Sequence, residues 1–225
     1  MQPTKPVVLF DIDYTLFDTA LYRDALLPSL LKHLGQHGNP EAKKIAETIY
    51  YHHRKRVGYF DLSVIVQEII HEFAVDVDAK DIFQKLLNDE ESYDSSLYEE
   101  TKETLQILSR IKNLRIGIFS GGRTDHQLKK IKSVSQFFQK EHVHIFTIKE
   151  QHIEKTFKKY TQEKAYFVDD VLKVLYEVKQ YNKNVITIWS KRGKMALNAQ
   201  PIEGFKADYT ITHLSELLPI VKGEK

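Results

Sequence analysis

Two acidic residues, Asp11 and Asp13, follow an apolar run near the amino terminus, Val7–Phe10. Four consecutive apolar residues, two of them β-branched, are typical of a strand buried on both faces of a parallel sheet. An open α/β sheet binds its ligands at the carboxyl ends of its strands, so we expect Asp11 to be accessible to a substrate there. Two carboxylates this close repel each other unless a cation or a shared proton compensates their charge. The pair therefore indicates a metal-binding site.

The same arrangement occurs twice more along the chain. The strand-like segment Arg115–Phe119 ends at Ser120–Gly122. A second segment, Ala165–Val168, ends at the acidic pair Asp169–Asp170. A single acid after a strand is often only a turn former or a helix cap. Three strands that deliver polar groups at the same edge of a sheet are harder to explain in that way, so we expect one common site.

The elements that must position these groups fall into two regions, of which the first is helical. From residue 17 to about residue 97 the sequence shows no convincing strand, but four patterns with an apolar stripe at helical spacing. These patterns cover residues 19–34, 40–53 (capped by Asn39), 62–73 (capped by Asp61) and 79–88. Four such stripes can bury one another, which predicts an all-helical unit inserted directly after the first strand.

In the second region, strands and helices alternate to the end of the chain. Helices are predicted over residues 98–111 (with Ser96–Glu99 as a capping box), 124–137, 154–160 and 171–181, and after a cap at Thr212. Further strands are predicted over residues 142–148, 184–189 and 207–211. Strands that alternate with helices pair in parallel through right-handed crossovers. The predicted fold class is therefore α/β, with a Rossmann-like parallel sheet as the core.

Length and composition exclude several classes of protein. A chain of 225 residues can build one good core with a smaller inserted domain. The absence of cysteine excludes disulfides, a thiolate nucleophile and a cysteine-based metal site. The formal net charge of +2 is too small to indicate a nucleic-acid partner. No apolar run is long enough to span a bilayer or to act as a signal peptide, so we expect a cytoplasmic protein without a membrane partner.

The chain resembles the haloacid dehalogenase-like hydrolase superfamily in four motifs. These are an Asp-x-Asp-x-Thr sequence, a hydroxyl residue that closes a strand, a lysine that opens the helix before the last acidic strand, and a pair of acids. They are matched by Asp11, Asp13 and Thr15, by Ser120, by Lys155, and by Asp169 and Asp170. The motifs occur in the family's order and span most of the chain, so the match is specific as a set.

This resemblance implies a phosphatase-like member with a helical (C1-type) cap. The Rossmann-like core domain would comprise residues 1–16 and 98–225, and the cap domain residues 17–97. The implied activity is Mg²⁺-dependent hydrolysis of a small phosphate monoester, whose identity the sequence leaves open. The oligomeric state is also left open.

The chemistry of this reaction assigns roles to the two amino-terminal acids. A phosphate ester repels nucleophiles, so a site that attacks it needs cations and hydrogen-bond donors around the phosphoryl oxygens. Asp11 would be the nucleophile, and its acyl phosphate divides the hydrolysis into two easier steps. Oxygen-only ligands favour Mg²⁺, and the resemblance implies ligation by the Asp11 and Asp170 carboxylates and by the Asp13 carbonyl. The Asp13 carboxyl is then free to exchange protons with the leaving group and with water.

The remaining site residues would hold the phosphoryl group. Ser120 and the Gly121 amide are expected to bind phosphoryl oxygens. Further substrate-binding candidates are Thr15, Gly122 and Arg123, although Arg123 could equally be a surface residue at a helix start.

The third motif has two candidate lysines, and the fourth lacks an acid that many family members carry. Lys155, at a plausible helix start, is preferred over Lys149 as the group that neutralises charge on Asp11 and the phosphoryl group. Many family members carry a further acid four residues after the metal-binding aspartate, where this chain has Val174. Asp169 could compensate as a group that supports the metal site.

Other activities on the same fold stay open. A haloacid dehalogenase displaces halide from carbon and needs neither a metal nor a proton donor, so Asp13 would have no task. Phosphomutase chemistry is another possibility, as is phosphonatase chemistry, which needs a cap lysine such as Lys32 or Lys55. A non-catalytic binding protein is disfavoured because the charge cluster is destabilising without a function.

Substrate choice is expected to lie in the cap. The stretch Tyr50–Arg56 is basic and aromatic, and one of its cations could bind a substrate carboxylate or second phosphate. A solvated basic helix end is the simpler interpretation. The histidine pairs His52–His53 and His142–His144 lack a third ligand at matching spacing, so no zinc site is predicted.

Overall fold

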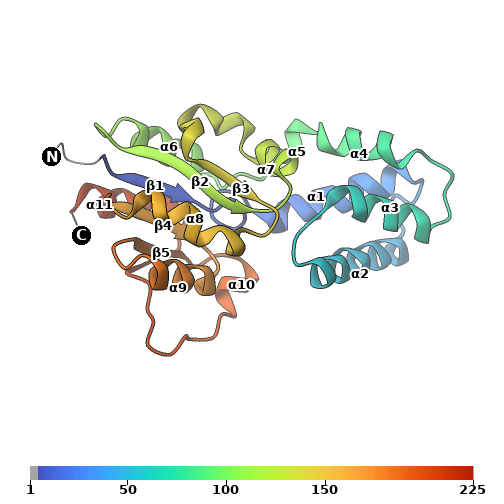
Figure 1. The fold of residues 1–225 in the computed structure, drawn as a ribbon. Coiled ribbons are helices and arrows are strands. Elements are labelled where there is room, and N and C mark those ends of the chain that lie inside the picture. Colours follow the sequence, from blue (N-terminus) through green and yellow to red (C-terminus); the bar gives the residue numbers. More distant parts are fainter. Residues whose placement is uncertain (1–4, 225) are drawn as a thin grey trace.

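Six parallel strands form one sheet in residues 5–224, the part of the chain that the computed structural model describes (Figure 1). The strands are β1 (Val7–Phe10), β2 (Arg115–Gly121), β3 (Val143–Phe146), β4 (Ala165–Asp169), β5 (Ile186–Ser190) and β6 (Tyr209–Ile211). Their order across the sheet is β3-β2-β1-β4-β5-β6. The predicted α/β class with a parallel core is therefore confirmed.

The central strand β1 is buried on both sides, as its unbroken apolar sequence predicts. Val8 and Phe10 face one hydrophobic core, and Val7 and Leu9 face the other. Helices α6 (Thr101–Ser109) and α11 (Leu217–Lys222) contribute to the first core, and α8 (Ile153–Phe157) and α9 (Leu172–Tyr181) to the second. The sheet is thus the middle layer of three.

The register of the sheet brings the polar strand ends together. Phe10 lies level with Ile118 of β2 and with Val168 of β4. The Asp11 amide continues this pairing by donating to the Val168 carbonyl at 2.9 Å. As a result, the residues that follow all three strands emerge at one edge of the sheet.

A tight turn follows β1 and carries the second acid. The amides of Leu16 and Phe17 both donate to the Ile12 carbonyl at 3.0 Å. Tyr14 has a φ of 54°, which is uncommon for a residue other than glycine and stores strain in this turn. The Tyr14 ring packs on Gly193, where a β-carbon would come within 2.4 Å of it. The turn therefore presents Asp13 toward the same edge of the sheet as Asp11.

A helical region extends beyond the carboxyl ends of the strands (Figure 1). Its helices are α1 (Thr19–His33), α2 (Pro40–Val57), α3 (Leu62–Glu72), α4 (Ala79–Leu87) and α5 (Glu90–Asp94). Phe17 and Leu97 pair in an antiparallel bridge, so the segments that enter and leave this region lie side by side. A helical region inserted after β1 agrees with the prediction from the sequence. The division into a core of residues 1–16 and 98–225 and a cap of residues 17–97 stays a prediction.

Three local expectations about the helices are wrong. The capping box at Ser96–Glu99 does not form, because the Ser96 hydroxyl donates to the Ser92 carbonyl at 2.7 Å in the unpredicted α5. Helix α6 instead begins at Thr101. The helix expected over residues 124–137 divides into α7 (Thr124–Lys130) and a 3₁₀ segment, and α10 (Gly193–Leu197) was not predicted.

The remaining elements of the described chain are short. The 3₁₀ segments are η1 (Lys132–Phe137), η2 (Lys140–His142), η3 (Lys149–His152), η4 (Lys158–Tyr160) and η5 (Leu214–Glu216). No helix among residues 5–224 combines the length and the apolar character needed to cross a membrane.

Candidate active site

A cavity of about 140 Å³ lies where the carboxyl ends of β1, β2 and β4 meet the helical region. Its core-side lining includes Asp11, Asp13, Gly121, Gly122, Gln127, Lys130, Lys149 and Asp170. Its lining from the helical region includes Thr19, Tyr22, Tyr50, Tyr59 and Phe60. The polar groups that the sequence places at three strand ends therefore surround or adjoin one space.

A buried lysine joins two of the acids. The Lys149 ammonium donates to Asp11 at 2.7 Å and to Asp169 at 2.6 Å. Burial alone would lower the pKa of Lys149, but the two adjacent carboxylates raise it above its ordinary value. Lys149 is therefore a permanent positive charge beside Asp11.

Three buried carboxylates form a cluster that suits a metal ion. Oxygens of Asp11, Asp169 and Asp170 lie within 4.8 Å of one another. Burial raises the pKa of Asp169 to about 7, and burial together with the neighbouring acids raises the pKa of Asp170 well above its ordinary value. Burial also raises the pKa of Asp11, an effect that Lys149 opposes. A single lysine thus leaves negative charge uncompensated, and oxygen-only donors fit a hard divalent cation such as Mg²⁺.

The carboxyl group of Asp13 is fully engaged, which corrects the expectation that it is free. It accepts hydrogen bonds from the Lys130 ammonium at 2.6 Å, from the Gln127 amide at 2.7 Å and from the Thr19 hydroxyl. Burial would raise the pKa of Asp13, but Lys130 and the other donors bring it below its ordinary value. Asp13 is therefore a carboxylate in this conformation.

The expected hydroxyl residues are buried rather than exposed to the cavity. Thr15 and Ser120 have no exposed surface, and neither hydroxyl has a hydrogen-bond partner of ordinary geometry within residues 5–224. The Ser120 hydroxyl nevertheless lies close enough to Asp11 to lower its pKa. Unpaired buried hydroxyls are rare, and the unpaired hydroxyl of Ser120 is the one that lies beside Asp11.

Two glycines, Gly121 and Gly122, follow Ser120. Both line the cavity. The Gly122 amide already donates to the Phe146 carbonyl at 2.8 Å, and substrate binding by Gly122 stays a prediction. Gly122 has a φ of 124°, and a β-carbon there would lie 2.8 Å from the side-chain amide nitrogen of Gln127. The absence of a side chain at Gly122 therefore allows the Gln127 side chain to reach Asp13.

The choice of Lys155 over Lys149 as the site lysine is wrong in this structure. Lys155 is exposed on α8, and within the described chain it makes no ion pair or hydrogen bond. Lys149 is the first residue of the 3₁₀ segment that follows β3, at the same edge of the sheet as the acids. Lys155 lies six residues further along the chain, inside α8, so closeness to the end of a strand decides which lysine reaches Asp11.

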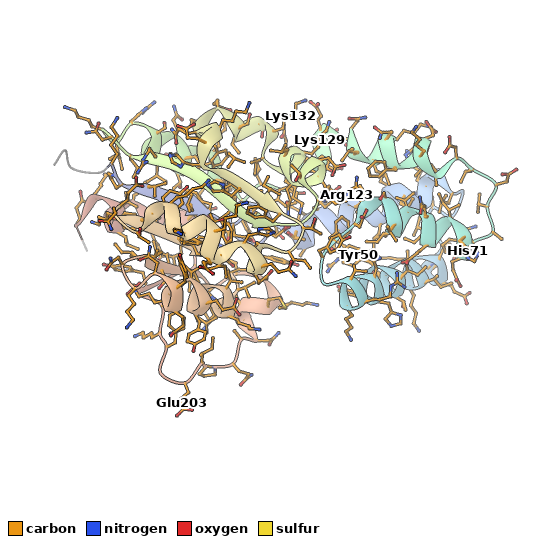
Figure 2. The ribbon with its side chains drawn as sticks, viewed as in Figure 1. Tyr50, His71, Arg123, Lys129, Lys132 and Glu203 are labelled. Atoms are coloured by element: carbon orange, nitrogen blue, oxygen red, sulfur yellow. The ribbon has the colours of Figure 1, made fainter. Side chains whose placement is uncertain are left out.

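Arg123 was a candidate either for substrate binding or for a surface residue at a helix start. It does not line the cavity. Its guanidinium lies 3.4 Å from the Asp61 carboxylate at the start of α3 and 2.7 Å from Asp125. Arg123 therefore links α7 to the helical region, and Figure 2 shows it between the sheet and that region.

Sequence reasoning missed the contribution of α7. Gln127 and Lys130 are buried and lie three residues apart, so both face Asp13 from one side of this helix. His126 is also buried, with its ring 5.7 Å from that of Tyr22. All three buried residues of α7 are polar and its one apolar residue, Leu128, is exposed, so the helix has no apolar stripe from which its buried face could have been predicted.

Comparison with known proteins supports the resemblance noted from the sequence. A family model described as haloacid dehalogenase-like hydrolase matches residues 8–140. No curated protein sequence matches the chain.

Solved structures of the same fold cover almost the whole chain. A haloacid dehalogenase-like hydrolase from Burkholderia xenovorans is 23% identical, with a TM-score of 0.74 and 98% of each chain covered. The magnesium-bound hydrolase YfnB from Bacillus subtilis is 17% identical, with a TM-score of 0.66 and coverage of 98% and 99%.

Structures of this fold carry more than one activity. They include a protein described as a phosphoglycolate phosphatase from Lactobacillus plantarum, which is 16% identical with a TM-score of 0.52 and covers 97% of this chain and 100% of its own. They also include an L-2-haloacid dehalogenase. At these identities the likeness shows the fold alone, so the chemistry must be inferred from the site.

Proposed function

The chain belongs to the haloacid dehalogenase-like hydrolase family, and we propose that it is a Mg²⁺-dependent phosphatase that hydrolyses a small phosphate monoester through an aspartyl phosphate on Asp11. The observation that carries this proposal is the buried cluster of Asp11, Asp169 and Asp170. Displacement of halide from carbon needs no cation, whereas attack on a phosphoryl group does. A cluster of three carboxylates with only one lysine can bind a cation, so it favours attack on a phosphoryl group.

The first step is the attack of an Asp11 oxygen on phosphorus. An oxygen–phosphorus bond forms, and the bond between phosphorus and the leaving oxygen breaks. Lys149 holds Asp11 in place at 2.7 Å and offers its ammonium to the phosphoryl oxygens. Mg²⁺ held by Asp11, Asp170 and the Asp13 carbonyl, with Asp169 in support, would neutralise the charge that keeps two anions apart. The Ser120 hydroxyl and the Gly121 amide would hold phosphoryl oxygens.

The second step is hydrolysis of the aspartyl phosphate, with Asp13 as the proton acceptor. Water attacks phosphorus, its proton passes to the Asp13 carboxylate, and the bond between Asp11 and phosphorus breaks. The bonds from Lys130 and Gln127 keep Asp13 in the ionised state that this step requires. The proton that Asp13 takes from water in this step is the one that it gives to the leaving oxygen in the first step of the next turnover.

Two other proposals accompany this one. Residues 17–97 act as the cap domain on a core of residues 1–16 and 98–225, and the protein is cytoplasmic. Phosphonatase chemistry has no support, because Lys32 and Lys55 are exposed and do not line the cavity.

The decisive assay compares two reactions of the purified protein. We expect phosphate release from p-nitrophenyl phosphate, and we expect Asp11→Asn and EDTA each to abolish it. Chloride release from a 2-haloacid is measured in parallel. If chloride is released in the presence of EDTA while phosphate is not released, the protein is a dehalogenase and the proposal is wrong.

A further inference from the structure

One wall of the cavity is aromatic and comes mainly from the helical region. Tyr22, Tyr50, Tyr59, Phe60 and His126 all line it. Most of these rings already pack on one another. The Phe60 ring lies 5.0 Å from that of His126 and 5.3 Å from that of Tyr50. Tyr50, labelled in Figure 2, lies within α2.

Tyr59 differs from the other rings of this wall. It lies in the turn between α2 and α3 and is partly exposed. Within the described chain, Tyr59 makes no hydrogen bond and no ring contact, although it lines the cavity. An aromatic ring at a cavity wall without a ring partner is a surface on which a planar group can stack.

The cavity offers no spare positive charge to a second anionic group. Among its described lining residues the only lysines are Lys130 and Lys149, and both are paired with acids of the site. Burial lowers the pKa of His126 well below its ordinary value, so this ring is neutral at pH 7. The exposed Glu150 also lines the cavity and would repel an anion.

Two arginines that do not line the cavity are held by acids. Arg123 pairs with Asp61, and Arg56 pairs with Glu68 on the cap surface. A leaving group with its own carboxylate or phosphate would therefore lose solvation on entering without gaining a partner.

The size of the cavity limits the leaving group further. Its volume of about 140 Å³ is close to that of an engineered cavity of about 150 Å³ that binds one benzene molecule. The phosphoryl group must share this space, so a leaving group with one ring already fills it and reaches the partly exposed Tyr59, and a larger leaving group would protrude past Tyr59.

We propose that the cavity takes a phosphate monoester whose leaving group is uncharged and carries one planar ring, which stacks on Tyr59. The inference rests on the proposed phosphatase function, because it assigns the aromatic wall to the leaving group. Tyr59 would determine specificity without taking part in the chemistry.

Binding of unreactive phosphonates tests this inference separately from catalysis. Benzylphosphonate and cyclohexylmethylphosphonate carry rings of similar size, of which only the first is planar. Calorimetry on the Mg²⁺-loaded protein should give a Kd for benzylphosphonate roughly two- to tenfold lower than for cyclohexylmethylphosphonate, which is the range expected from ring stacking. Phosphonoacetate, which carries a second anion, should bind at least tenfold more weakly than benzylphosphonate.

Variants show whether Tyr59 causes the preference. Tyr59→Leu should remove the preference for the planar ring, and Tyr59→Phe should keep it. Tyr181→Leu, at a Tyr that is 36% exposed on α9, is the matched control and should also keep it. Equal Kd values for the two rings in the natural sequence, or a preference that persists in Tyr59→Leu, would overturn the inference. Preferential binding without hydrolysis of any ester would instead contradict only the phosphatase function.

Discussion

Replacement of Lys149 by methionine tests whether Lys149, as the structure indicates, or Lys155, as the motif order indicates, is the lysine that acts on Asp11. Methionine keeps much of the side-chain volume but removes the ammonium that lies 2.7 Å from Asp11 and 2.6 Å from Asp169. The matched control is Lys155→Met, because Lys155 is exposed and lies on a neighbouring helix.

Two magnitudes follow from the contacts of Lys149. Loss of one preorganised donor at a reacting oxyanion typically costs about 10²- to 10³-fold in kcat. Removal of one partner from a buried ion pair typically destabilises a protein by about 3–5 kcal/mol. Here the loss should be at the lower end, about 3 kcal/mol, because burial raises the pKa of Asp169 to about 7 and a proton can replace the lost charge.

The assay measures both quantities on each variant. Phosphate release from p-nitrophenyl phosphate gives kcat, and urea unfolding gives the free energy of unfolding. We expect Lys149→Met to show both losses and Lys155→Met to change the free energy of unfolding by less than about 0.5 kcal/mol, with kcat preserved. A large loss of kcat in Lys155→Met, with normal activity in Lys149→Met, would refute the assignment.

Two further predictions concern the acids. Burial raises the pKa of Asp169 to about 7 and also raises the pKa of Asp170 well above its ordinary value. The metal-free folded protein therefore holds protons that the unfolded chain has released, and the free energy of unfolding that they contribute is lost as pH rises through about 7. Mg²⁺ replaces these protons, so the increase in Tm on adding MgCl₂ should be larger at pH 8 than at pH 6, and an equal increase at both values would contradict the raised pKa values. Lys130→Met removes the cation that lowers the pKa of Asp13 most, so the acidic limb of the pH profile of kcat should move to higher pH. The exposed Lys132→Met is its control, and coincident profiles for all three proteins would show that Asp13 is not the titrating group.

The sequence was sufficient to predict those parts of the fold that rest on local patterns. The buried apolar run of β1 and the alternation of strands and helices after residue 97 predicted a parallel sheet, which the structure has. The capping box predicted at Ser96–Glu99 does not form, because the Ser96 hydroxyl donates to the carbonyl of Ser92 in α5. Helix α5 is too short to show an apolar stripe, so the sequence did not predict it. Short helices such as α5 and α10 depend on tertiary contacts that a local pattern does not contain.

The site was predictable where its residues lie at the ends of strands. Asp11, Ser120 and Asp170 are brought together because the register of the sheet aligns the ends of β1, β2 and β4. Lys149 lies three residues after β3 and therefore near the same edge, and the error arose from giving priority to the helix start near Lys155.

Other site features come from side-chain contacts across the sheet edge. Gln127 and Lys130 reach Asp13 from more than a hundred residues away in sequence, so no local pattern shows that they neutralise it. The link from Arg123 to Asp61 likewise depends on how the helical region packs against α7.

The central claim, that Asp11 accepts the phosphoryl group, is tested most directly by chemical trapping. The protein is mixed with p-nitrophenyl phosphate and Mg²⁺, quenched within one turnover and treated with hydroxylamine, which converts an aspartyl phosphate to a hydroxamate. Mass spectrometry of the peptide that contains Asp11 and Asp13 should locate the hydroxamate at Asp11. Phosphate release without any modification of Asp11, or a hydroxamate at another acid, would contradict the account.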